Sequence, residues 1–149
     1  TALEQDATVT VTRGDTGEQQ SLTLPGKAPN SSGTDNGNGT VTDSSTGLIW
    51  QQTDDTTYRD WQGAIDYCDA LTLGGSSAWR LPSIDELQSL IDTSYTPTID
   101  PIFIGTARHA YWSNTTDESW PPIAWGVNFN DADVSDFGQG STLYVRCVR

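Results

Sequence analysis

Residues 79–90, WRLPSIDELQSL, contain a helix start that the sequence alone reveals. Pro82 ends the preceding extended segment, and Ser83 is placed to accept hydrogen bonds from the first free N–H groups of a helix. Glu86, three residues later, completes a capping box. The apolar residues that follow recur at three- and four-residue spacing, which predicts a helix of roughly 8–10 residues that ends near Thr93. They are Ile84, Leu87, Leu90 and Ile91.

The composition predicts a domain with a small, aromatic core. Of the 149 residues, 34% are hydrophobic, yet Trp (6) and Tyr (5) are plentiful. No apolar run is long enough to span a membrane, and the first residues do not resemble a signal peptide. The formal net charge of −13 repels nucleic acid and anionic membranes. Either these acidic residues keep the domain soluble, or some of them bind a hard cation such as calcium.

The two cysteines, Cys68 and Cys147, lie far apart in the sequence. With no C-x-x-C motif and a single histidine, a zinc site is nearly excluded. A distant pair is typical of one disulfide in an oxidising compartment. Two unrelated reduced thiols are the alternative that the residues leave open.

The first third of the chain predicts two hairpins. Residues 1–33 contain two weakly alternating runs and then a linker rich in Pro, Gly, Ser and Asn. Residues 40–42 and 48–51 alternate on either side of turn residues, which predicts a second hairpin. We therefore expect a hairpin and linker at 1–33, and a separate domain at 34–149.

The rest of the chain predicts one more helix and then strands separated by loops. Asp60 or Thr57 caps this helix, Cys68 lies on its apolar face, and Gly74-Gly75 ends it. Alternating segments predict strands at 110–113, 124–129 and 143–149, and the polar stretches at 115–122 and 130–140 predict loops.

Several motifs occur together in one order and spacing. They are DNGNGTVTDSSTGLIW (35–50), WQGAIDYC (61–68), WRLPSIDELQSL (79–90), YWS (111–113) and YVRCVR (144–149). Over roughly residues 34–149, the chain resembles the bacterial Lcl C-terminal-domain family, named for the end domain of a collagen-like adhesin. The resemblance implies an α+β, C-type-lectin-like fold of the formylglycine-generating-enzyme branch, with two helices around a small, mostly antiparallel sheet and long loops. It also implies a disulfide between Cys68 and Cys147.

The resemblance further implies a secreted or cell-surface domain with a role in adhesion or glycan binding; a periplasmic location is the alternative. The named adhesin is associated with sulfated glycans, but a chain with a charge of −13 is a poor partner for polyanions. We therefore expect a neutral sugar, or an acidic sugar bridged by a cation. The enzymes of this fold branch use two active-site cysteines. Both cysteines here match structural positions, so we expect no enzymatic activity.

Calcium is the candidate cofactor. Oxygen-bearing side chains recur around the end of the strand predicted at 124–129, and calcium requires six to eight such ligands. The predicted metal ligands are Asn128, Asp131, Asp133 and Asp136. A solvated acidic loop is the alternative interpretation of the same residues.

A sugar site needs an exposed aromatic ring and fixed polar groups. Trp120, beside Pro121 and Pro122, is the one tryptophan in a loop-like context, whereas the others lie in segments typical of a core. The predicted ligand-binding residues are Trp120, Asn128, Asn130, Asp131 and Asp133. His109 is the only histidine, and a surface or structural role is expected for it.

The sequence thus predicts a non-enzymatic extracellular recognition domain that binds a glycan or a surface protein through loops at about 112–140. No nucleic-acid binding and no membrane insertion are expected. The alternative is a protein-binding or variable display module of the same fold, which requires neither sugar nor calcium.

Overall fold

The computed structural model describes residues 8–12, 19–23, 33–117 and 122–149. The chain divides into two compact units, Thr1–Ser32 and Gly33–Arg149. In the first unit, strands β1 (Thr8–Thr12) and β2 (Gln19–Thr23) form the predicted antiparallel hairpin, with Val9 opposite Leu22. The described helices and the remaining described strands belong to the second unit.

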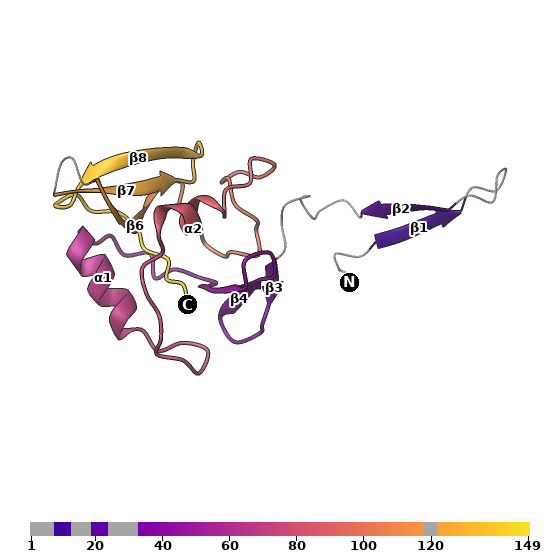
Figure 1. Cartoon of the computed structure of the whole chain (residues 1–149), viewed down its shortest axis with the longest axis horizontal. Coiled ribbons are helices and arrows are strands. Elements are labelled where there is room, and N and C mark those ends of the chain that lie inside the picture. The colour runs from indigo at the N-terminus through magenta and orange to yellow at the C-terminus, as the bar shows by residue number, and fades with distance from the viewer. Residues whose placement is uncertain (1–7, 13–18, 24–32, 118–121) are drawn as a thin grey trace. The chain divides into compact units, whose positions relative to one another are not determined.

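The described residues of the second unit form two small antiparallel sheets and two helices (Figure 1). Strands β3 (Gly33–Asp35), β4 (Thr40–Asp43) and β5 (Leu48–Gln51) form one sheet. Strands β6 (Ala110–Thr116), β7 (Ile123–Asn128) and β8 (Asp133–Gly138) form the other. Helix α1 (Trp61–Ala70) contacts β6, and α2 (Ile84–Gln88) contacts β6 and β7. The α+β class with two helices is confirmed, with two three-stranded sheets in place of the single sheet expected.

Helix α1 begins where the sequence predicts and ends earlier. The Asp60 side chain accepts a hydrogen bond from the Gly63 N–H at 2.8 Å, so Asp60 and not Thr57 is the cap. Cys68 is fully buried on the inner face of the helix. The prediction that Gly74-Gly75 ends the helix is wrong, because the backbone of Leu71 is already extended.

The predicted capping box is present at the start of α2. Ser83 Oγ accepts from the Glu86 N–H at 3.2 Å, and Glu86 Oε1 accepts from the Ser83 N–H at 2.9 Å. The predicted length is wrong, since α2 ends at Gln88. The Ser89 hydroxyl donates to the Glu86 carbonyl, and the next N–H groups bond three residues back instead of four. Such tightening is common at helix C-termini. The apolar spacing nevertheless buries Leu90.

Strand β8 lies within the segment 130–140 that was predicted to be a loop. Ala132, at φ 65°, reverses the chain and brings Asp133 opposite Asn128. From there β8 pairs with β7 along its whole length. Residues rich in Asp, Ser and Gly have low strand propensity, so it is this pairing that makes the segment a strand.

The predicted terminal strand at 143–149 is also corrected. This segment forms isolated bridges with different parts of the chain: Arg59, Tyr111, Trp50 and Arg80. Cys147, within the segment, forms a disulfide with Cys68 of α1, with their Cα atoms 5.6 Å apart. The implied disulfide is therefore confirmed. The disulfide attaches α1 to this last segment, which also bridges to Trp50 of one sheet and to Tyr111 of the other.

Candidate functional site

A cleft of about 210 Å³ lies where the last segment of the chain passes the start of β6. It is lined by side chains from five separate parts of the second unit: Tyr58, His109, Ala110, Asn128, Phe137, Thr142, Leu143 and Tyr144. Backbone hydrogen bonds hold these parts together. Arg59 and Leu143 exchange N–H···O bonds of 2.8 and 2.9 Å, and the Tyr144 N–H donates to the Ala110 carbonyl at 3.1 Å. Backbone hydrogen bonds therefore fix the last segment against Arg59 and β6, on either side of it.

Tyr144 is the centre of an aromatic cluster in this cleft. Its ring centroid lies 4.8 Å from that of Tyr58, 5.8 Å from that of His109 and 5.5 Å from that of Tyr111. Tyr111 is fully buried beneath the cluster, whereas Tyr58 is 58% exposed and His109 is also exposed. Tyr58 and His109 consequently offer aromatic surface to a ligand, and Tyr144 fixes their separation.

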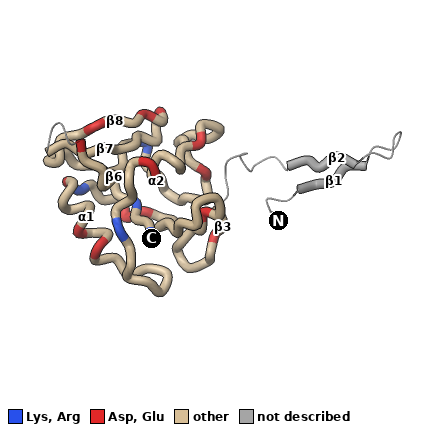
Figure 2. Tube along the Cα trace, in the orientation of Figure 1, with Lys and Arg blue, Asp and Glu red and all other residues tan. Residues whose placement is uncertain are grey.

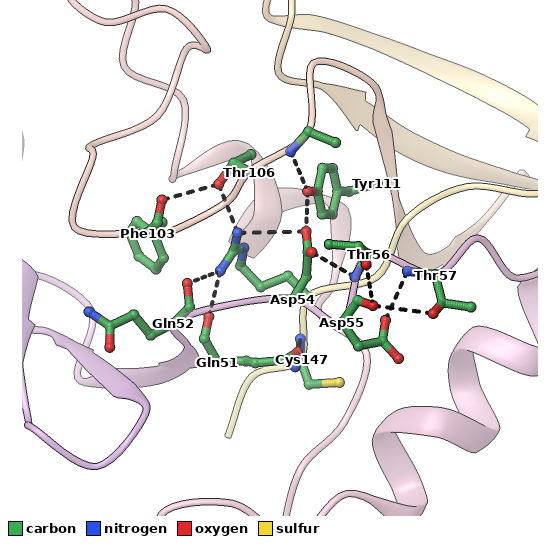
Figure 3. A network of polar contacts seen from close by, with 12 residues as sticks. Gln51, Gln52, Asp54, Asp55, Thr56, Thr57, Phe103, Thr106, Tyr111 and Cys147 are labelled. Carbon is green, nitrogen blue, oxygen red and sulfur yellow. Dashed lines mark hydrogen bonds and ion pairs between the residues drawn. The ribbon is translucent and has the colours of Figure 1, made fainter.

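A buried polar network holds Tyr111 in place (Figure 3). The Tyr111 hydroxyl donates to Asp54 Oδ2 and accepts from the Ala107 N–H at 2.8 Å. Arg146, which has no exposed surface, places its guanidinium 3.9 Å from Asp54 Oδ2 and donates to Thr106 Oγ1 at 2.7 Å. Tyr111, which stacks against Tyr144 of the cleft, is thus held by hydrogen bonds and an ion pair in the core.

The same network contains three further donor–acceptor pairs. Arg146 also donates to the carbonyls of Gln51 and Gln52, and the Cys147 N–H donates to Gln51 Oε1 at 3.0 Å. The disulfide and the ion pair therefore stabilise one segment, residues 144–148, from two sides. Because a buried charge is tolerated only when it is paired and hydrogen-bonded, this segment has little freedom to move.

Tyr111 and Tyr144 are neutral at neutral pH, because the pKa of each is raised. Burial raises the pKa of Tyr111, and a side-chain hydrogen bond with Tyr58 raises the pKa of Tyr144. Burial lowers the pKa of Arg146, an effect that Tyr111 and Asp54 oppose. Neutral phenol groups both donate and accept hydrogen bonds. The cleft therefore presents aromatic rings together with uncharged hydroxyl groups.

Asn128 supplies an amide to the lining of the cleft. It stands at the end of β7, opposite Ala110 of β6 and opposite Asp133 of β8. Its Oδ1 accepts from the Asn130 N–H at 2.8 Å, which orients the side chain. The amide nitrogen Nδ2, with two N–H donors, remains for a ligand.

The sequence model of the Lcl C-terminal domain family matches residues 39–149, which is more than half of the chain. The chain belongs to this family. The match includes every residue of the cleft and both cysteines. No curated protein matches the chain in sequence.

The side chains predicted to bind a metal in this Lcl C-terminal domain do not all converge on one position. Asp133 and Asp136, three positions apart on β8, lie on opposite faces of the sheet, since side chains alternate along a strand. Asp131 Oδ1 accepts from the Asp133 N–H, and Asp133 Oδ2 from the Ser135 hydroxyl. Among the described residues, no three His, Cys, Asp or Glu side chains form a group that could hold a metal ion. The calcium site stays a prediction.

Of the predicted ligand-binding residues, Asn128 lines the cleft. Asn130, Asp131 and Asp133 lie in and after the adjoining turn between β7 and β8. Trp120 lies outside the residues that the structure describes. The sequence reasoning missed Tyr58, His109 and Tyr144, which come from three separate segments and meet only in the fold. Tyr58, in the polar stretch before α1, was the one signal available, because an aromatic residue among Asp and Thr is apt to be exposed.

A second hollow of about 320 Å³ lies in the Lcl C-terminal domain, within the loop between α2 and β6. Its walls are mainly apolar and include Tyr95, Pro97, Pro101 and Ile104, which is 51% exposed. Although it is larger, it has fewer convergent polar groups than the aromatic cleft. Small-molecule sites combine an apolar wall with a few placed polar groups, so we regard the aromatic cleft as the candidate site.

Proposed function

We propose that this Lcl C-terminal domain is a non-enzymatic extracellular recognition domain that binds a glycan in the cleft around Tyr144. The observation that carries the proposal is the meeting of exposed aromatic rings with neutral hydroxyl and amide groups. Aromatic rings bind the apolar face of a sugar, and the polar groups bind its hydroxyls. The C-type-lectin-like fold belongs to this proposal, supported by the disulfide that joins the first helix to the last segment.

The extracellular location is consistent with family membership and with the disulfide, which persists in oxidising compartments. No helix in the described part of the chain is long and apolar enough to cross a membrane.

A glycan array with two matched variants tests this function. Tyr58→Ala removes an exposed ring from the cleft, and Tyr95→Ala removes a tyrosine from the second hollow. We expect Tyr58→Ala to weaken binding about tenfold, because an aromatic contact contributes up to about 1.5 kcal/mol beyond its buried area. Tyr95→Ala should leave binding unchanged. Near-UV circular dichroism of both variants checks that they fold.

Protein binding is the second candidate function, because Ile104 is an exposed large apolar side chain in the second hollow. Under this alternative no glycan on the array binds the protein, with or without calcium. Binding to a protein partner is then lost in the variant Ile104→Asp and retained in the variant Tyr58→Ala.

A further inference from the structure

We propose that the cleft selects a single uncharged sugar residue and rejects its sulfated derivatives. This inference rests on the proposed function and specifies the ligand class of the same site. Three observations support it: the charges that line the cleft, the charges that surround it, and its volume.

Among the described residues, the lining of the cleft offers no lysine or arginine to a sulfate or carboxylate. Its polar groups are phenol hydroxyls, the imidazole of His109, the Thr142 hydroxyl and the Asn128 amide. Proteins usually hold sulfated and phosphorylated groups through Arg or Lys, often by bidentate hydrogen bonds. A charged sugar would therefore lose its hydration in this cleft without gaining an ion pair.

The three arginines that are close to the cleft in the sequence do not supply that charge. Arg146, two residues after Tyr144, is fully buried, and its guanidinium is paired with Asp54. Arg59 follows Tyr58, but its guanidinium forms a bidentate pair with Asp55 at 2.6 and 3.0 Å and lies 4.0 Å from the centroid of the Tyr67 ring. Arg108 precedes His109 and is exposed outside the lining. The charge of Arg59 is therefore already paired with a carboxylate, and its guanidinium lies over a ring of α1.

The surroundings of the cleft repel anions. Asp133 stands opposite Asn128 in the β7–β8 pairing, so a carboxylate lies on the strand beside this residue of the cleft. Acidic residues also lie on α1, α2 and β8 of the second unit (Figure 2). With a formal net charge of −13, the chain disfavours the approach of any anionic glycan.

The volume limits how much of a glycan the cleft can enclose. Pockets that enclose drug-sized ligands have volumes of roughly 300–1,000 Å³. At about 210 Å³, the cleft falls below this range, which favours a single sugar residue over an enclosed oligosaccharide. Asn128 and Tyr58 both line this space, so a single sugar has an amide and an aromatic ring within one cleft.

The experiment compares neutral and sulfated single sugars on the full chain. The probes are methyl glycosides of galactose, glucose, mannose, fucose, N-acetylglucosamine and N-acetylgalactosamine, with the 6-sulfates of galactose and N-acetylglucosamine. Saturation-transfer NMR measures binding, because single sugars bind weakly. We expect at least one neutral glycoside to bind, a tenfold loss in Tyr58→Ala, and at least a threefold weaker signal for a sulfated derivative than for its parent.

A gain-of-function variant tests the role of charge separately from folding, because a folding defect cannot increase binding. Thr142 is exposed and lines the cleft, so Thr142→Lys adds a cation there, and Thr142→Gln is a control of similar length without charge. We expect Thr142→Lys, and not Thr142→Gln, to bind the 6-sulfates about threefold more tightly than the wild type.

Two results would overturn the inference and leave the proposed function standing. One is a sulfated sugar that binds the wild type as tightly as its neutral parent. The other is Tyr58-dependent binding of array oligosaccharides when no single sugar binds. If no glycan on the array binds, or if Tyr58→Ala binds glycans as tightly as the wild type, the proposed function is wrong. The inference is then wrong as well.

Discussion

Removal of the Cys68–Cys147 disulfide should cost a large part of the stability of the second unit. The bond joins residues separated by 79 positions, and both cysteines are fully buried. In the chain-entropy description, opening a loop of this length costs about 4.5 kcal/mol at 25 °C. Domains are typically stable by about 5–15 kcal/mol, so the cost approaches the whole stability of a marginal domain. We expect Cys68→Ala/Cys147→Ala to melt roughly 15–20 °C below the wild type.

Urea unfolding followed by tryptophan fluorescence measures this loss. All six tryptophans lie at residue 50 or later, so the signal reports the second unit alone. The wild type unfolded and refolded in reductant is the control, because it keeps both sulfur atoms and lacks only the bond. The slope of the unfolding free energy with urea should rise in both, since an uncrosslinked chain exposes more surface when it unfolds.

Two results would refute the reasoning. A loss below about 1 kcal/mol with an unchanged slope would mean that the bond does not restrict the unfolded chain. Reaction of both thiols with a labelling reagent in the native, unreduced protein would mean that the bond is not formed. The single substitutions Cys68→Ala and Cys147→Ala should each resemble the double one, because either removes the bond.

Four further predictions concern other parts of the second unit. Arg146→Met should cost about 3–5 kcal/mol in urea unfolding, because it leaves the buried carboxylate of Asp54 without its ion pair; a cost below about 1 kcal/mol would contradict this. Gly126→Ala should cost about 1–3 kcal/mol, since its Cβ would lie 2.7 Å from the Tyr111 carbonyl oxygen, whereas Gly138→Ala, with no atom nearer than 3.9 Å, should be nearly neutral. The hydrogen bond from Arg80 lowers the pKa of Glu86, so the stability it contributes is present at neutral pH and lost as the pH falls below about 4.5; Glu86→Gln should flatten acid unfolding curves there, unless the pair contributes nothing. Melting temperatures in calcium and in chelator should agree within about 1 °C, because the carboxylates of β8 lie on opposite faces; a rise of several degrees in calcium would restore the predicted ion site.

The sequence by itself determined the local features of this protein. The capping box at Ser83, the Asp60 cap and the strands around Trp50 and Trp125 depend on residues within a few positions of one another, so they were predictable. The ends of the helices were predicted less well, because N–H groups that bond three residues back, such as Leu71 to Cys68 and Leu90 to Leu87, end each helix while the apolar pattern continues.

Only the tertiary structure decided β8, the path of the last segment and the candidate cleft. Strand β8 exists because β7 lies beside it, and its own residues favour a loop. Tyr58, His109 and Tyr144 are separated by at least 35 positions and meet because the last segment pairs with both Arg59 and β6. A sequence records which side chains are available, but contacts between distant residues depend on the packing of the whole unit.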